Sequence, residues 1–197
     1  MAGETEFAMG AEASCADGPA GKVTRVIIDP DTQAVTHLVI EPRYRLGAGR
    51  LVPLDLVDAT ADGIRLRCTV EEFGRLEAAE ETEVVDGLVG GLALGGFGPP
   101  LGVAAPVQAI VQDVVPVGEE DIDRGQPVHA LDGAIGRVEG VRVDPGDHRV
   151  THVLLAEGHL WGRREVLIPA SAVTKVEGGI WLNLTKEQVE DLPQANG

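Results

Sequence analysis

Aromatic side chains are scarce in this chain: they make up 3% of its 197 residues, with two Trp and one Tyr. Because 44% of the residues are nevertheless apolar, the core must be built from Val, Ile, Leu and Ala. Basic residues are also few, with 16 Lys and Arg against 32 Asp and Glu, which gives a formal net charge of −16. That charge repels phosphate groups, so neither nucleic acid nor an anionic lipid surface is an expected partner.

Cysteine is nearly absent as well. Cys15 and Cys68 are too few for a disulfide-stapled scaffold, and both are expected to be small buried apolar side chains rather than catalytic thiols. The opening residues lack the basic and apolar regions of a signal peptide. A reduced, cytoplasmic location is therefore expected.

The chain repeats itself, which is the most informative feature of the sequence. Residues 10–37 realign with residues 125–152, and after a one-residue insertion residues 53–76 realign with residues 169–192. Identical pairs include Gly18/Gly133, Gly21/Gly136, Pro30/Pro145, Thr36/Thr151, His37/His152, Pro53/Pro169 and Ile64/Ile180. We therefore divide the chain into a first module (5–77), a linker (78–118) and a second module (119–195), and expect each module to fold by itself.

Each copy has the pattern of a small β-domain. Short β-branched runs are separated by turns such as Asp29–Thr32 and Asp144–Asp147, in which Pro and Asp favour the turn conformation. Each copy then ends in a short helix with a capping box, Thr69–Glu72 and Thr185–Gln188. The predicted strands are Lys22–Ile28, Val35–Ile40, Leu51–Leu54 and Ile64–Cys68 in the first copy, and Arg137–Val143, Val150–Leu155, Val166–Pro169 and Ile180–Leu184 in the second.

The sequence thus predicts an all-β protein of two small barrels, because so few short strands must curl to hide their apolar face. Positions that are apolar in both copies, such as Val26/Val141 and Leu66/Leu182, are the expected core. Positions where the copies differ in polarity, such as Ile27/Arg142 and Arg65/Trp181, are expected to face outward.

The linker differs in composition from both modules. Residues 87–112 carry no charged side chain, yet they hold seven Gly and include Pro99-Pro100, which a membrane-spanning helix does not accommodate. We expect no membrane span here but an irregular, Gly/Pro-rich linker or a segment docked on the apolar surface of a barrel. The Val-rich stretch 108–117 is expected to add an edge strand ahead of the second copy.

Four segments of the second copy together resemble the PRC-barrel family: Asp132–Val138, Asp144-Pro145, Val150–His152 and Ile168-Pro169. That family includes the cytoplasmic domain of the photosynthetic reaction centre H subunit and the C-terminal domain of a ribosome maturation factor. The resemblance implies a small β-barrel used for protein–protein contact, without catalysis of its own. It implies neither photosynthesis nor ribosome maturation, because features specific to those two proteins are missing.

No pattern of catalytic, metal-binding or cofactor-binding residues stands out, so we expect no enzyme, no metal and no cofactor. His148 and His152, if they flank a strand start, lie about 13 Å apart, which is too far for one ion. Gly18, Gly21 and Lys22 lack the spacing of a phosphate loop and precede a strand rather than a helix.

The candidate interaction surface is the longest strand-to-strand loop of each copy. Each loop combines an aromatic residue with Arg residues in an acidic protein, and Trp, Tyr and Arg dominate binding hot spots. The expected contact residues are Arg43, Tyr44 and Arg45 in the first copy, and His159, Leu160, Trp161, Arg163 and Arg164 in the second.

The expected function is protein–protein interaction or scaffolding with an unknown partner, including self-association or packing of the two barrels as a pseudo-twofold pair. The alternative is a stress-related binding protein that responds to a small ligand or a metal at a barrel mouth.

Overall fold

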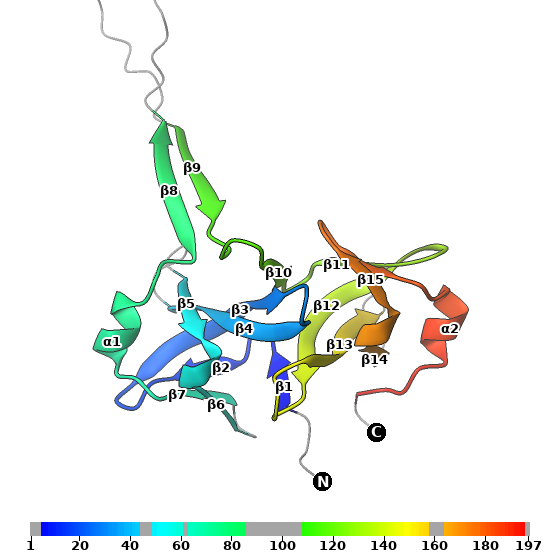
Figure 1. Cartoon of the computed structure of the whole chain (residues 1–197), viewed down its shortest axis with the longest axis horizontal. Helices are drawn as coiled ribbons and strands as arrows, with labels where there is room; N and C mark the ends of the chain where they lie inside the picture. Colours follow the sequence, from blue (N-terminus) through cyan, green and yellow to red (C-terminus); the bar gives the residue numbers. More distant parts are fainter. Residues whose placement is uncertain (1–4, 44–48, 61–62, 86–107, 158–163, 196–197) are drawn as a thin grey trace, which may run out of the picture.

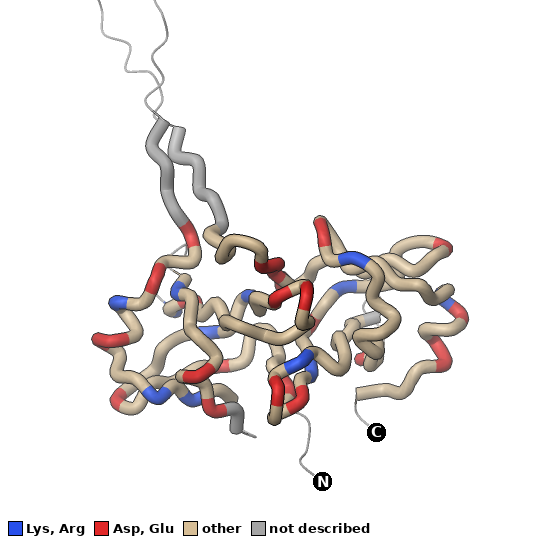
Figure 2. Tube along the Cα trace, viewed as in Figure 1, with Lys and Arg blue, Asp and Glu red and all other residues tan. Residues whose placement is uncertain are grey.

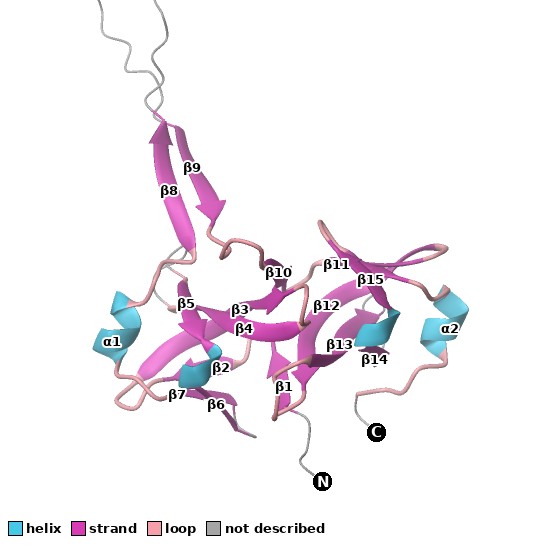
Figure 3. Cartoon of the chain, viewed as in Figure 1, coloured by secondary structure: helices cyan, strands magenta, loops and turns pink. Residues whose placement is uncertain are grey.

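The computed structural model describes residues 5–43, 49–60, 63–85, 108–157 and 164–195. Strands dominate these residues and form two seven-stranded, barrel-like sheets and a separate two-stranded hairpin (Figures 1 and 3). The two sheets lie side by side, and each carries one short helix at its outer end (Figure 1). The predicted all-β class with two barrels is confirmed.

The first barrel has the strand order β5-β4-β3-β2-β7-β6, and β10 pairs with β3. The edge position of β5 fits Pro53, which has no N–H to donate to a ladder. The elements of the first barrel are β2 (Glu12–Ser14), β3 (Pro19–Asp29), β4 (Ala34–Glu41), β5 (Arg50–Pro53), a 3-10 turn (Leu54–Leu56), β6 (Val57–Thr60), β7 (Gly63–Leu66), α1 (Val70–Arg75) and β10 (Glu120–Asp123).

The second barrel repeats this order as β14-β13-β12-β11-β16-β15, and β1 pairs with β12. Its elements are β1 (Thr5–Ala8), β11 (Pro127–Ala130), β12 (Gly133–Val143), β13 (Val150–Glu157), β14 (Arg164–Pro169), a 3-10 turn (Ala170–Ala172), β15 (Val173–Val176), β16 (Ile180–Leu182) and α2 (Lys186–Glu190).

Both predicted capping boxes are present. The side chains of Thr69 and Thr185 each accept a hydrogen bond from the backbone N–H three residues on, and the side chain there bonds back to the threonine N–H. A carboxylate from an earlier turn adds a second cap, because Asp17 accepts from Val70 N at 2.8 Å and Asp132 accepts from Lys186 N at 2.9 Å. Helices this short depend on such caps to satisfy their first N–H groups.

The two barrels exchange strands, which the sequence analysis did not foresee. β1 lies in the sequence of the first module but pairs antiparallel with β12, placing Phe7 opposite Val141. β10 opens the second module but pairs with β3, placing Ile122 opposite Val26. The expected boundaries at 5–77 and 119–195 are therefore crossed in both directions, by segments that occupy equivalent places in the repeat.

Further backbone hydrogen bonds join the halves reciprocally. Val35 N donates to the carbonyl of His148, and Val150 N donates to the carbonyl of Gln33, each at 2.9 Å. Gln33 and His148 occupy equivalent turn positions and both have positive φ, 57° and 59°. The left-handed conformation is uncommon for such side chains, and here it accompanies the contact between the two turns.

One hydrophobic core runs through both barrels. Phe7 and Ile122 are 3% and 2% exposed, and they pack in the same cluster as core residues of both sheets, including Val26, Val141 and Leu155. A core shared between halves, together with exchanged strands, means that neither half can be removed without exposing the interior of the other.

Part of the linker is ordered as a hairpin. β8 (Glu80–Val85) pairs antiparallel with β9 (Gln108–Asp113), and the two strands project together away from the barrels (Figure 1). The expected edge strand at 108–117 thus exists over Gln108–Asp113, but its partner is β8 rather than the second barrel. The apolar stretch that joins β8 to β9 lies outside the described residues.

The chain after β9 covers the outer face of the first sheet. Val114 and Val115 pack on a second apolar cluster made of Ile27, Val39, Leu51 and Ala79. Ile27, expected to face outward, is therefore not exposed at all. No helix in the described part of the chain is long and apolar enough to cross a membrane.

The strand exchange predicts that the halves stay associated without a covalent link. If a protease site is placed between residues 90 and 105 and cut, the two fragments should elute together on size exclusion and unfold in one transition. The reason is that β1 and β10 each complete the other half's sheet. Uncut protein carrying the same site is the control, and fragments that separate under native conditions would contradict the prediction.

Candidate functional site

Arg43 is the one predicted contact residue whose side chain the structure describes. Tyr44, Arg45, His159, Leu160, Trp161 and Arg163 lie outside the described residues. Arg164 begins β14, where its backbone pairs with Glu157. The loop predictions can therefore be followed only at the place where Arg43 leaves β4.

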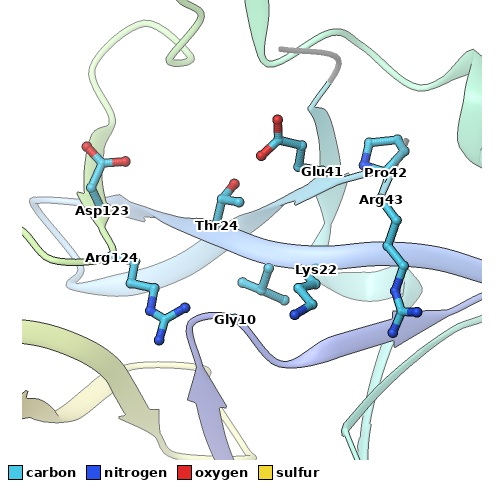
Figure 4. Close-up of a pocket in the computed structure, with 9 residues that line it drawn as sticks. Gly10, Lys22, Thr24, Glu41, Pro42, Arg43, Asp123 and Arg124 are labelled. Carbon is cyan, nitrogen blue, oxygen red and sulfur yellow. The ribbon is translucent and has the colours of Figure 1, made fainter. Parts of the chain in front are cut away.

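Arg43 lines an open groove of about 830 Å³ beside β3 (Figure 4). The groove is formed where the end of β4, the turn after β1 and the chain leaving β10 meet β3, so the strand exchange builds it. Its lining residues are Gly10, Lys22, Val23, Thr24, Glu41, Pro42, Arg43, Asp123 and Arg124.

Positively and negatively charged side chains of the groove lie on opposite sides of β3 (Figure 4). The cationic groups of Lys22, Arg43 and Arg124 lie along one side of β3, and the carboxylates of Glu41 and Asp123 point the other way (Figure 4). Acidic residues are spread over both barrels (Figure 2), so three cations around one groove are a local exception in a chain of net charge −16.

The three cations differ in their pairing. Arg43 is ion-paired with Glu12, and Arg124 lies 3.4 Å from Glu139. Lys22 is exposed and has no ion-pair partner among the described residues. Both arginine side chains are about half exposed, at 48% and 52%, so water and salt screen the two pairs and they can open for a ligand at small cost.

Gly10 lies against the side chain of Arg124 in the groove. Its φ is +91°, and a Cβ atom there would lie 2.7 Å from a guanidinium nitrogen of Arg124. A residue with a side chain at this position is therefore disfavoured by the backbone conformation, and it would also require the end of the Arg124 side chain to move.

Arg25, on β3, anchors the hairpin of β8 and β9 to the first barrel. Its side chain is buried and lies 3.5 Å from Glu80 and 3.7 Å from Asp123, and it donates to the carbonyl of Ala79 at 3.4 Å. A buried guanidinium needs such carboxylate partners, so Arg25 fixes the start of β8 and the end of β10 in relation to β3.

The equivalent histidines His37 and His152 each lie beside the hydroxyl of the preceding threonine. Nδ1 of His37 lies 3.0 Å from Oγ1 of Thr36, and Nδ1 of His152 lies 3.1 Å from Oγ1 of Thr151. Thr36 also donates to Glu119 at 2.6 Å, and that carboxylate lies 3.5 Å from His37. In the part of the chain that the structure describes, no three His, Cys, Asp or Glu side chains gather where they could hold a metal ion.

The cysteines are buried, as predicted, and they lie together in the first barrel. Cys15 is 6% and Cys68 is 7% exposed. Burial, followed by the neighbouring thiol of Cys68 and the charge of Asp17, raises the pKa of Cys15 from its ordinary 9.0 to about 12. The Cys15 thiol is therefore protonated at neutral pH, which is the opposite of what a catalytic thiolate needs.

Sequence reasoning missed an aromatic surface on the second barrel. Trp181 and His129 stack with ring centroids 4.3 Å apart, on paired positions of β16 and β11. Trp181 is 44% exposed, and the nearby Leu131 is 69% exposed. The outward orientation of Trp181 was predicted from its pairing with Arg65 in the repeat, but the stack depends on the pairing of β11 with β16.

The fold and the groove together define a protein of two fused small β-barrels. The family model of the PRC-barrel domain matches residues 124–189, so the second barrel is a PRC-barrel domain. The first barrel, with the same strand order, is its structural repeat. No curated protein matches the chain.

The raised pKa of Cys15 predicts a loss of stability at alkaline pH. The unfolded chain releases the thiol proton near pH 9, whereas the folded chain keeps it until about pH 12. The contribution is therefore complete below pH 9 and declines between these values as pH rises. Urea melts from pH 8 to 11 should show a steeper decline for the native chain than for Cys15→Ala, which copies Ala130 of the second barrel; equal declines would exclude this group as the cause.

Proposed function

We propose that this chain is a non-catalytic protein-binding scaffold, and that the groove beside β3 holds an acidic, extended segment of its partner. The observation that carries the proposal is the row of Lys22, Arg43 and Arg124 along one side of the groove (Figure 4). In an otherwise acidic molecule, such a row attracts a carboxylate-bearing peptide while the remaining surface repels it.

The shape of the groove supports a chain-like ligand. The groove is open along β3 rather than closed around a compact cavity, and Arg43, which lines it, directly precedes the loop residues Tyr44 and Arg45 in the sequence. A peptide lying on Lys22 and Arg43 would reach that loop, whose aromatic and basic side chains suit a protein contact. The matching loop of the second barrel, with Trp161, offers a second contact of the same kind.

A small anionic ligand is the alternative occupant. About 830 Å³ falls within the size range of small-molecule sites. The open shape of the groove favours the peptide, because small-molecule sites enclose most of the surface of their ligand. Binding measurements with two ligands distinguish these hypotheses. A small dicarboxylate carries two negative charges, whereas a glutamate-rich peptide carries a row of them.

The groove proposal predicts salt-sensitive binding of an acidic peptide. A fluorescent ten-residue glutamate-rich peptide should bind the native chain at low salt and bind more weakly as salt rises. The double variant Lys22→Glu/Arg43→Glu should weaken binding by about tenfold or more, which is about 1.4 kcal/mol. Fluorescence polarisation measures both.

The matched control is Lys175→Glu/Lys186→Glu, which makes the same change in net charge at two exposed residues of the second barrel. Binding that is weakened equally by the control would show that only net charge matters. A peptide that does not bind at all, beside a small dicarboxylate that binds and is lost in the double variant, would favour the small-ligand alternative.

The second-barrel loop carries a separate prediction. Trp161→Ala should weaken self-association or partner binding by about 2 kcal/mol, since tryptophans are enriched among binding hot spots. It should leave the melting temperature nearly unchanged, because loops contribute few core contacts. Sedimentation equilibrium beside a thermal melt tests this, with Trp181→Ala as control; lost stability with unchanged association would identify Trp161 as part of the barrel interior instead.

A further inference from the structure

The chain's two cysteines are brought side by side by the parallel pairing of β2 with β7. Ala13 pairs with Ile64 and Ser14 with Arg65, and the chain continues from these pairs to Cys15 and Cys68. One residue further on, Ala16 N donates to the carbonyl of Cys68 at 3.0 Å. Residues 53 positions apart in sequence thus become direct neighbours at one end of the first barrel.

The local geometry suits a covalent bridge. The backbone bond from Ala16 to Cys68 brings the two cysteine Cα atoms near the range of bridged pairs, which is about 4.4–6.8 Å. Both side chains belong to the same barrel core, and the Cys68 thiol is near enough to help raise the pKa of Cys15. The equivalent residues of the second barrel are Ala130 and Leu184, so the thiol pair is particular to the first.

We propose that Cys15 and Cys68 are a redox site, forming a reversible disulfide when the chain meets a small-molecule disulfide such as oxidised glutathione. One cysteine thiolate attacks the glutathione disulfide and releases one glutathione thiol. The other cysteine then attacks the mixed disulfide, forms the Cys15–Cys68 bond and releases the second glutathione thiol. The chain loses two protons and two electrons, which are taken up as one oxidised glutathione becomes two reduced molecules.

Bridging would fasten the N-terminal arm to the barrel. Cys15 follows β2, which continues directly from the exchanged strand β1, and Cys68 precedes α1. The closed loop contains β3 to β7, so the bond restricts the unfolded chain over most of the first barrel. The inference is independent of the groove, which holds neither cysteine.

The test follows the full-length chain through refolding, because the protonated, buried thiols react slowly in the folded state. Reduced protein is unfolded in urea and diluted into a mixture of oxidised and reduced glutathione at pH 8. Intact mass should show a folded chain lacking two hydrogens and carrying no glutathione. Its melting temperature should exceed that of the reduced chain by about 5 °C or more.

Cys15→Ala is the matched control, because alanine already occupies the equivalent position of the second barrel. This variant should fold, keep one thiol or carry one glutathione, and melt at the same temperature in both redox buffers. Oxidation of the folded native chain without urea should give the same bridge more slowly, so the result does not depend on refolding. Native protein that keeps two free thiols, that carries glutathione on them, or that melts lower when bridged would overturn the proposal.

Discussion

The backbone hydrogen bonds of two exchanged strands hold this molecule together. β1 binds along β12 and β10 binds along β3 in matching registers, so that Thr5 faces Val143 as Glu120 faces Ile28. Sheet edges left open by the loss of either strand would expose unpaired N–H and carbonyl groups and the apolar sites of Phe7 and Ile122. The shared core, the contact between the two turns and the groove beside β3 all depend on this pairing.

The two copies differ at one position that faces the exchanged strands. Gly140 lies opposite Ala8, and a Cβ atom there would come within 2.7 Å of the carbonyl oxygen of Phe7. Its counterpart is Arg25, opposite Asp123, whose buried guanidinium reaches Glu80 at the start of the hairpin. This position therefore needs a close backbone approach in the second barrel and a charged side chain in the first. Among the described residues, only the first barrel is joined to the separate hairpin of β8 and β9.

Local signals explain why much of the fold could be predicted. The capping boxes at Thr69 and Thr185 involve residues within one helical turn. The alternation of apolar and polar residues along β3 and β12 indicates which face of each strand is buried. The strand exchange has no local signal, because the short alternating stretch Thr5–Ala8 fits the edge of either barrel equally well. Ile27 did carry a signal, since apolar residues at 26, 27 and 28 fill both faces of a strand and therefore require cover on both.

The candidate site was harder to predict than the fold for a related physical reason. Arg43 was singled out by its loop, but Lys22 joins it through the pairing of β3 with β4, and Arg124 joins it only because β10 crosses to the first barrel. The stack of His129 on Trp181 likewise arises from residues on two strands that are distant in sequence. Such constellations are products of tertiary pairing, and spacing along the chain does not reveal them.

The reciprocal exchange makes this chain the single-polypeptide counterpart of a symmetric dimer. In a true dimer each substitution appears twice, so both faces must tolerate it and both must serve the same purpose. Joining the copies removes that constraint, and the consequences are already visible: Ser14 and Arg65 on one barrel stand where His129 and Trp181 stand on the other, and Cys15 and Cys68 stand where Ala130 and Leu184 stand. Two copies joined in one chain thus let a single fold carry two surfaces that differ from each other.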